Sequence, residues 1–424
     1  MKSSCNHAII CLYFACMLNI SGSMAQVNWT KSPAGPLPAP GFSWTSNGIP
    51  FVYITEMQDT LRMWFTGADG NTVGNDRIGY ATSLDGVVFN YQPIPVLEPG
   101  DNPDAFDSEG VFGASVIHDG TMFKMWYNGY NTQPYYAGNM EAGLATSVDG
   151  INWTKFPGNP VLPKGNPGDF DMQWAYANTV LFENGEYKMW YTGFNGTSAG
   201  IGYATSNDGI TWLKYPGNPV ITAGGPGTGA LLNVQNARVI HSLAGYEMWF
   251  NGNSADPDFN VYYASSLDGT AWVCLPLPVL VTGAPGSFDQ DWAWHPNVIF
   301  DEGVYRMWYS GYDGMEWAIG MASDSSLAGM EDHPAAQSLQ PAVILYPNPA
   351  TDHADCEIHL PSEQTISVKL YDFQGCVLGS NQETRLSAGN HIISVDVKNL
   401  APGLYYCSMT GSNFRLTGKV VVGF

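Results

Sequence analysis

One hexapeptide occurs five times in this chain of 424 residues, and it constrains the fold more than any other feature of the sequence. RMWFTG (62–67) is followed by KMWYNG (124–129), KMWYTG (188–193), EMWFNG (247–252) and RMWYSG (306–311). The five methionines are separated by 62, 64, 59 and 59 residues. A repeat of that length is too long for one hairpin and too short for a domain. It predicts one small β-sheet per repeat, arranged radially as the five blades of a propeller.

The third repeat (178–220) shows how one blade is built. Its first strand is apolar and ends at the turn Glu183-Asn184-Gly185, and the alternating, aromatic strand EYKMWYTG (186–193) follows. IGYATS (201–206), the turn Asn207-Asp208-Gly209 and ITWLK (210–214) complete the unit. Four antiparallel strands joined by short turns form one propeller blade. The turn motif S-x-D-G-x-x-aromatic recurs at 83–89, 147–153, 206–212 and 266–272, so we interpret it as structural.

The fifth repeat lacks that turn, because MASDSS (321–326) runs into a polar segment. VNWTKSP (27–33), near the start of the chain, closely matches INWTKFP (151–157), which is a fourth strand. We therefore predict that residues 27–31 supply the outer strand of blade five and close a propeller spanning residues 26–326. Closure would also remove exposed sheet edges.

Residues 1–25 have the features of a secretory signal peptide: a basic Lys2, an apolar stretch and a small-x-small site at Ser23-Met24-Ala25. A lipid anchor on Cys16 is the alternative. No other segment is long and apolar enough to cross a membrane as a helix. The chain has 38 acidic and 16 basic residues, a formal charge of −22, and no basic cluster, so nucleic acid is excluded as a partner.

After a linker (327–340), the sequence changes character. Short spans of alternating apolar residues over 341–424 predict a small β-sandwich. This part resembles the C-terminal sorting domain of the type IX secretion system of Bacteroidota. The resemblance rests on Tyr346-Pro347-Asn348-Pro349, the Tyr371 to Gly375 strand and turn, Leu400 to Tyr405 and Lys419-Val420-Val421. It implies export across the outer membrane through the type IX machinery.

Four cysteines remain after the signal peptide, and their spacing fits neither a dense disulfide framework nor a metal motif. One disulfide within the C-terminal part is compatible with the sequence, but the pairing is open. The four residues are Cys274, Cys356, Cys376 and Cys407.

Residues 42–330 resemble the five-bladed superfamily of glycoside hydrolase families 32, 43, 68 and 130. The five repeats, the phrase YATSxDGxxW and the Asn-Pro-Val pieces at 159–161 and 218–220 carry the resemblance. It implies an all-β fold, here a five-bladed β-propeller followed by a small C-terminal β-sandwich. It also implies a central pocket lined by the innermost strand of each blade and a carbohydrate substrate.

Cleaving a glycosidic bond requires two carboxyl groups, one to protonate the leaving oxygen and one to activate water or attack directly. A Phe-Asp pair recurs in three blades, and two residues after it the blades carry different residue types. Such a difference at one position of a repeat is expected where a side chain lines a functional pocket. Blade two has Glu109, blade three Gln173 and blade five Asp291. We predict Glu109 as the acid and Asp291 or Asp107 as the base, with Asp171 as the nearest substitute.

Asp107, Asp171 and Asp289 form the recurrent Phe-Asp pairs, so a structural role at a turn or strand start is the alternative for them. The inner strand of blade one, WTSNGIPFVYI (44–54), has no acid, although family 43 places one there. Either this chain uses acids from other blades or it binds without cutting.

Several further residues on the inner strands are candidates for substrate binding. Aromatic faces stack on sugar rings, and Arg238 could hold a carboxylate sugar or pair with Asp107 or Asp291. His295 could bond sugar or, as the family-43 resemblance suggests, contact a central structural calcium ion; a core histidine is the alternative. No other cofactor is required. The candidates are His295, Arg238, Asn236, Trp174, Trp292, Trp294 and Tyr176.

The sequence thus predicts a secreted glycoside hydrolase acting on a polysaccharide or oligosaccharide. The alternative is a lectin-like propeller that binds glycan without cleaving it. A central carboxyl group with a strongly raised pKa would favour the enzyme, whereas an acid-poor pocket rimmed by aromatics would favour the lectin.

Overall fold

The structure is a computed structural model. It describes residues 29–57, 60–69, 75–132, 138–229, 231–242, 245–254, 258–301, 304–324, 345–346, 350–360, 362–371, 377–398, 400, 403–410 and 415–422. The signal peptide predicted for residues 1–25 and the linker predicted for 327–340 lie outside these ranges. No helix in the described part of the chain is long and apolar enough to cross a membrane.

Five antiparallel units of four strands follow one another along the chain. The first contains β2 (Phe51–Met57), β3 (Thr60–Gly67), β4 (Arg77–Ser83) and β5 (Asn90–Tyr91), and the second β6 (Gly110–His118), β7 (Phe123–Tyr130), β8 (Met140–Ser147) and β9 (Thr154–Lys155). The third contains β10 (Trp174–Glu183), β11 (Glu186–Phe194), β12 (Ala199–Ser206) and β13 (Leu213–Lys214), with β14 (Ile221–Thr222) also paired to β12. The fourth contains β15 (Asn233–Ser242), β16 (Gly245–Asn253), β17 (Asn260–Ser266) and β18 (Val273–Cys274).

The fifth unit takes its outer strand from the other end of the chain. β19 (Trp292–Asp301), β20 (Val304–Tyr312) and β21 (Trp317–Asp324) are completed by β1 (Trp29–Lys31), which pairs antiparallel with β21. β1 lies in the register that the fourth strands of the other blades adopt, because Lys31 pairs with Ala322 as Lys155 pairs with Ala145. This is the position that the match between VNWTKSP and INWTKFP assigned to the N-terminal strand.

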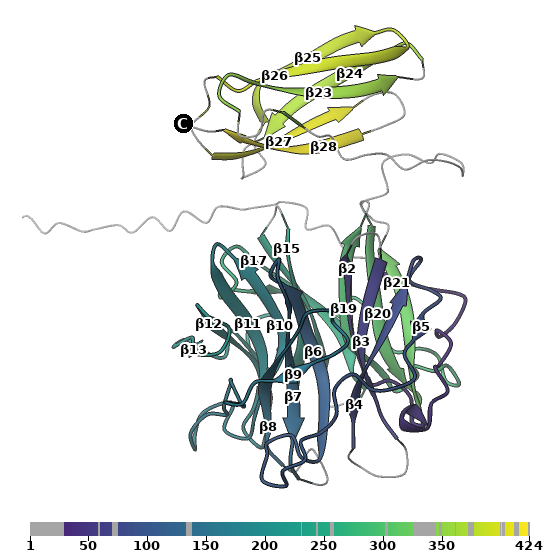
Figure 1. Ribbon diagram of the computed structural model, residues 1–424, viewed down its shortest axis with the longest axis vertical. Coiled ribbons are helices and arrows are strands. Elements are labelled where there is room, and N and C mark those ends of the chain that lie inside the picture. The colour runs from purple at the N-terminus through teal and green to yellow at the C-terminus, as the bar shows by residue number, and fades with distance from the viewer. Residues whose placement is uncertain are drawn as a thin grey trace, which may run out of the picture.

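The innermost strands form a closed ring. β2 contacts β6, β6 contacts β10, β10 contacts β15, β15 contacts β19, and β19 returns to β2. In Figure 1 the green strands β19, β20 and β21 accordingly lie beside the purple strands β2 and β3. The described residues contain no helix beyond one 3-10 turn (Ser43–Thr45), so the all-β prediction is confirmed.

The tryptophan of the repeated hexapeptide ties each blade to the next. Its ring is buried, and its indole N–H donates to the carbonyl of the Gly in the next blade's S-x-D-G turn. The four bonds are Trp64 to Gly150, Trp126 to Gly209 and Trp190 to Gly269, all 2.9 Å, and Trp308 to Gly86, 2.8 Å. Because blade five has no such turn, the Trp249 indole N–H has no partner among the described residues, and Trp29 of β1 packs edge-on against its ring instead.

The S-x-D-G turns are held by their own side chains. In the turn of blade two, Ser147 Oγ accepts from Gly150 N at 2.9 Å, and Asp149 Oδ1 accepts from Ile151 N and Asn152 N at 2.9 and 2.8 Å. The backbone bond from Asn152 is the largest of the interactions that lower the pKa of Asp149. The motif is therefore structural, as its repetition indicates.

The C-terminal part is a two-sheet β-sandwich with its own core. One sheet contains β22 (Leu345–Tyr346), β23 (His353–Leu360) and β26 (Gly389–Asp396); the other contains β24 (Gln364–Tyr371), β25 (Val377–Leu386), β27 (Gly403–Thr410) and β28 (Arg415–Val422). Cys407 is buried in this core, and Cys274 of the propeller forms no disulfide among the described residues. The side chains of Cys356 and Cys376 lie outside the described residues.

Candidate functional site

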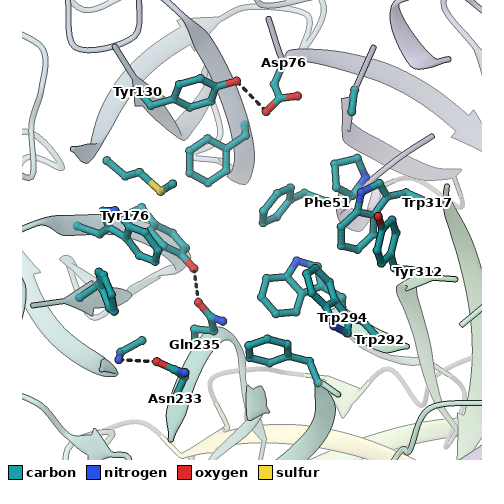
Figure 2. A pocket seen from close by; sticks show the side chains of 18 of the residues that line it. Phe51, Asp76, Tyr130, Tyr176, Asn233, Gln235, Trp292, Trp294, Tyr312 and Trp317 are labelled. Atoms are coloured by element: carbon teal, nitrogen blue, oxygen red, sulfur yellow. Dashed lines mark hydrogen bonds between the residues drawn. The ribbon is translucent and has the colours of Figure 1, made fainter. Parts of the chain in front are cut away.

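A cavity of about 560 Å³ opens where the first residues of the inner strands converge (Figure 2). Its walls are mainly aromatic, and its few polar groups are two carboxyl groups, side-chain amides and hydroxyls. The lining residues are Asn47, Pro50, Phe51, Ala68, Asp69, Asp76, Phe112, Tyr130, Met140, Trp174, Tyr176, Phe194, Thr197, Ala199, Asn233, Gln235, Phe259, Trp292, Trp294, Tyr312 and Trp317.

Equivalent positions of the repeat build most of this pocket. The position just before the third-strand motif contributes one residue from every blade: Asp76, Met140, Ala199, Phe259 and Trp317. The residue after the hexapeptide contributes Ala68, Tyr130, Phe194 and Tyr312. The fold therefore brings the same backbone positions to one mouth of the ring, and the side chains at those positions decide the chemistry.

Asp76 is the only carboxyl group at the first of these positions. It precedes β4, and its own backbone carbonyl accepts from Val111 N of the neighbouring blade at 3.0 Å. Tyr130 Oη donates to Asp76 Oδ2 at 3.0 Å, and the pair is drawn in Figure 2. Burial raises the pKa of Asp76 to about 6, and the nearby charge of Asp69 adds to the rise, while the Tyr130 bond opposes it. Asp76 can therefore hold a proton near neutral pH inside the pocket.

Asp69 is the second carboxyl group of the pocket. Arg77 Nη1 lies 3.9 Å from its Oδ2, and Asn75 Nδ2 donates to the same oxygen at 3.4 Å. Arg77 Nε also lies 2.6 Å from Glu98 Oε2, so the guanidinium of Arg77 is shared between Asp69 and Glu98. The two pocket acids thus differ in surroundings: Asp69 has a cationic neighbour at its oxygens, whereas Asp76 has a phenol.

Two aromatic walls face each other across the cavity. Trp174 stacks on Phe194 with ring centroids 4.2 Å apart, on the side of blade three. Trp292 packs against Tyr312 at 5.1 Å and against Trp317 at 5.5 Å, on the side of blade five. Figure 2 shows the labelled Tyr176 and the Trp292–Trp294–Tyr312–Trp317 group on opposite sides of the open space. Flat aromatic faces with a few polar groups between them suit a sugar ring, which has both apolar faces and hydroxyls.

The acids predicted from the sequence do not line this pocket. Glu109 is exposed, and its N–H donates to Tyr130 O at 3.0 Å; Asp291 N donates to Tyr312 O at the same distance. Within blades two and five, these two backbone bonds therefore extend the pairing of the first and second strands by one residue, at the rim. The two carboxyl groups that line the pocket are Asp76 and Asp69.

Asp107 and Asp171 lie in buried polar units away from the cavity. Asp107 Oδ2 accepts from Lys155 Nζ at 2.6 Å and from Tyr127 Oη at 2.9 Å. Asp171 has the same partners in Lys214 and Tyr191, and Asp289 in Lys31 and Tyr309. Since the unit recurs in three blades, the structural alternative stated for the Phe-Asp pairs describes these residues better than a catalytic role.

The aromatic residues predicted to bind sugar line the pocket, whereas Asn236 does not. Trp174, Trp292, Trp294 and Tyr176 all line the pocket. Asn236 is buried beneath it: its side-chain oxygen accepts from Tyr176 Oη at 2.9 Å, and its φ of 58° marks a bulge of the inner strand. Asn236 therefore positions Tyr176 and does not line the cavity.

His295 occupies the equivalent bulge in blade five, with φ 47°. It is buried, its backbone N–H donates to Asn251 Oδ1 at 2.7 Å, and its ring lies edge-on to Phe51. Its Nδ1 has no partner among the described residues. Burial lowers the pKa of His295 to about 3, so the ring is neutral.

These surroundings do not fit calcium. That ion takes six to eight oxygen ligands, whereas His295 faces an aromatic ring and has the cation of Arg238 nearby. The described residues also contain no group of three His, Cys, Asp or Glu side chains placed to hold a metal ion.

Arg238 lies on the side of the ring of inner strands that is opposite to the aromatic pocket. Its side chain is 9% exposed and lines a second cavity, on the far side of the bulges from the aromatic pocket. It pairs with neither Asp107 nor Asp291. Arg238 therefore does not line the aromatic pocket, and its role in holding a carboxylate sugar stays a prediction.

Asp76 and Asp69 were missed because the comparison of blades used only the inner strands. Aligning the third strands RIGYATS (77–83), EAGLATS (141–147) and GIGYATS (200–206) would have found Asp76. The residue before this motif is acidic only in blade one. Asp69 lies in a connection of variable length, which carries no repeat signal.

Comparisons with known proteins bear on both parts of the chain. Residues 344–423 match the secretion system C-terminal sorting domain, which confirms the predicted sorting domain and export to the cell surface or beyond. An uncharacterized protein of Mycobacterium tuberculosis is 27% identical over 296 residues, which are 68% of this chain and 90% of that protein.

Solved structures similar to the propeller include glycoside hydrolases. One belongs to the GH130 family of mannoside phosphorylases and represents hydrolases that target β-1,2 mannosidic linkages in Candida mannan; it is 18% identical, with a TM-score of 0.54, over 69% of this chain and 93% of that one. A family 117 glycoside hydrolase of Zobellia galactanivorans is 13% identical, with a TM-score of 0.54, over 72% of this chain and 93% of that one. The chain therefore has the propeller fold of these enzymes.

Proposed function

We propose that this protein is an exported enzyme that hydrolyses glycosidic bonds in an oligosaccharide or polysaccharide, with Asp76 as the proton donor. One observation carries the proposal: the carboxyl group of Asp76 lines a pocket with aromatic walls, where burial raises its pKa to about 6. A general acid works best when its pKa is close to the working pH, and burial is the usual means of raising a carboxyl pKa to that range.

In this mechanism the aromatic walls bind the sugar rings and orient the scissile bond toward Asp76. Protonated Asp76 donates its proton to the leaving oxygen as the bond breaks, which avoids expelling an alkoxide. Tyr130 Oη then stabilises the carboxylate that remains, because it donates to Asp76 Oδ2. Asp69, whose Oδ2 lies 3.9 Å from Arg77 Nη1, is the group that would receive a proton from the attacking water.

Hydrolysis is favoured over phosphorolysis by the charge of the pocket. A phosphorylase must bind inorganic phosphate as its nucleophile, and phosphate sites are built from Arg, Lys or backbone N–H donors. No Lys, Arg or His is among the described residues that line the pocket. Two carboxyl groups offer phosphate no cationic partner, whereas they suit protonation of the leaving oxygen and activation of water.

A glycan-binding propeller without catalysis is the second candidate. The observation that favours it is the composition of the lining, in which aromatic side chains far outnumber the two acids. Because stacking alone gives affinity, the pocket could bind a sugar even if Asp69 lies too far from the bond to activate water.

The test is release of reducing ends from a panel of glycans by the whole chain and by Asp76→Asn. The panel includes β-1,2-linked mannosides, since a structurally similar hydrolase targets them. We expect turnover by the wild type and a loss of about 10²–10⁴-fold in Asp76→Asn, with glycan binding retained. Glu109→Gln and Asp291→Asn test the acids predicted from sequence, and we expect near wild-type rates. Binding by all variants without turnover by any would establish the lectin.

A further inference from the structure

A second cavity, of about 470 Å³, lies around the later residues of four inner strands, at the other end of the channel. We propose that it binds a small organic carboxylate with an apolar body, recognised by the guanidinium of Arg238. This site is separate from the aromatic pocket, because the two cavities have no lining residue in common. The inference is therefore independent of the proposed hydrolase.

Arg238 presents unused hydrogen-bond donors to this cavity. Its Nε donates to Val298 O of the neighbouring blade at 3.1 Å, and its guanidinium carbon lies 4.8 Å from the centroid of the Tyr53 ring. The two terminal nitrogens have no hydrogen-bond partner among the described residues, yet neither is fully enclosed. They therefore open onto the cavity that the side chain lines. Two terminal N–H groups in a planar fork match the two oxygens of a carboxylate.

The charge of Arg238 also lacks a counterion. It forms no ion pair with any residue in the described ranges. The one carboxylate that lines the cavity, Glu183, is already bound by Lys188 Nζ at 3.0 Å, Tyr246 Oη at 2.6 Å and His241 Nδ1 at 2.7 Å. A cation that is 9% exposed is costly without a partner, so an anion from solution would be stabilised there.

The same position in the other blades shows that an arginine is not needed for folding. Ser115 Oγ accepts from Val180 N at 2.8 Å, Thr179 Oγ1 from Val239 N at 3.1 Å, and Asn297 Oδ1 from Ile54 N at 3.1 Å. Each of these small side chains links its inner strand to the next one. Arg238 makes one such link with Nε and adds a charged group that the link does not use.

The remaining walls select against a purely inorganic anion. Most residues that line this cavity are apolar, among them Met57, Ile117, Leu181 and Ile240. A hydrated phosphate or sulfate would leave these surfaces wet and would bring two charges to a single cation. A monocarboxylate with a compact apolar body instead matches the charge of Arg238 and covers the walls, which lowers the free energy of the complex.

Benzoate is a suitable probe, with benzyl alcohol as its uncharged match and sulfate as an anion without an apolar body. Calorimetric titration of the whole chain should show saturable benzoate binding that is at least about tenfold tighter than binding of either control. Arg238→Met keeps much of the side-chain length and removes the charge, so it should weaken benzoate binding at least about tenfold. Asp76→Asn in the other pocket should leave that binding unchanged.

A crystal grown with 4-bromobenzoate locates the ligand even if Arg238→Met does not fold, because the bromine scatters anomalously. A bromine peak in the cavity of Arg238 would support the proposal. A peak only in the aromatic pocket, equal binding of benzoate and benzyl alcohol, or full benzoate binding by Arg238→Met would each overturn it. Equal binding of sulfate and benzoate would overturn the assignment to an organic carboxylate.

Discussion

At the level of single residues, the bond from Tyr130 to Asp76 sets the pH range of the proposed reaction. The acid must be protonated, so kcat/KM should fall as the pH rises through about 6. The Tyr130 bond lowers the pKa of Asp76, so Tyr130→Phe should raise that pKa and move the falling limb to higher pH, by up to about one unit. Tyr312→Phe, at the equivalent position of blade five, is the matched control and should leave the limb in place. A pH profile of kcat/KM measures both, and a shift to lower pH in Tyr130→Phe would contradict the assignment.

The same carboxyl group should make the fold less stable at high pH. Burial raises the pKa of Asp76 from 3.8, the ordinary value of an aspartate, to about 6 in the folded protein, so folding favours the protonated form. Its contribution to stability is complete below about pH 4 and is lost as the pH rises through 6. Asp76→Asn should therefore be more stable than the wild type at pH 8, by about 3 kcal/mol, and lose that advantage at pH 4. Denaturant unfolding at the two pH values measures the difference, and an equal difference at both would refute the raised pKa.

At the level of the blade, Asp107, Tyr127 and Lys155 of blade two should contribute to the free energy of unfolding cooperatively, because both partners bond the same carboxyl group. Blade four has Phe250 and Cys274 where blade two has Tyr127 and Lys155, so the phenol and the amine are lost together. Lys155→Met alone would leave Asp107 buried without its cation and should cost about 2–4 kcal/mol. Adding Asp107→Ala and Tyr127→Phe to that variant should recover part of the loss. Thermal unfolding compares the single and triple variants; a triple variant less stable than the single one would show that the three residues act separately.

The indole of Trp249 in blade four provides a matched control for measuring how much the Trp126 hydrogen bond contributes to stability. Trp126→Phe removes a bond of 2.9 Å to Gly209 O, whereas Trp249→Phe removes an N–H that has no partner among the described residues. Both changes remove similar ring volume from fully buried sites, so the cavity costs should nearly cancel. We expect Trp126→Phe to be the more destabilising by about 1 kcal/mol. Equal losses of stability would mean that the bond to the turn contributes nothing to the contact between blades.

These cases also show which parts of the molecule the sequence could predict. The hexapeptide and the S-x-D-G turn recur because backbone pairing and ring packing demand the same side chain in each blade, so repetition revealed the fold. A residue that gives the pocket its chemistry can be recognised in the sequence only because its residue type differs from those at the aligned position of the other blades. That comparison works where the copies have equal spacing, as before β4, and it could have identified Asp76. It fails in connections of unequal length, such as the one that contains Asp69.

Glu109 and Asp291 illustrate the opposite error. They differ between blades, yet neither lines the pocket, and the bond that places each of them is a backbone bond to the second strand. Divergence at a repeat position thus does not by itself mark a pocket residue. The three-dimensional position of the side chain relative to the cavity is also needed, and the sequence does not give it.

At the scale of the whole molecule, ring closure by β1 should decide the stability of all five blades. β1 supplies the outer strand of blade five, the ion pair of Lys31 with Asp289 and the contact of Trp29 with Trp249. Removing the chain through Pro33 would leave Asp289 buried without a cation and expose the edge of β21. Since each inner strand contacts its neighbours around the ring, the loss should spread beyond blade five. We expect the Tm of the propeller to fall by about 10 °C or more.

Two controls separate closure from the loss of one ion pair. Lys31→Met keeps the strand and should lower the Tm by less than the truncation does. A synthetic peptide of residues 27–33 should restore part of the lost Tm, because an unpaired edge strand accepts an added strand through backbone bonds. A truncated chain that unfolds at the wild-type temperature would mean that the ring is held closed by β19 and β2 alone, through the bond from Ile54 N to Asn297 and the packing around it. The N-terminal strand would then serve only to cover the edge of the last sheet.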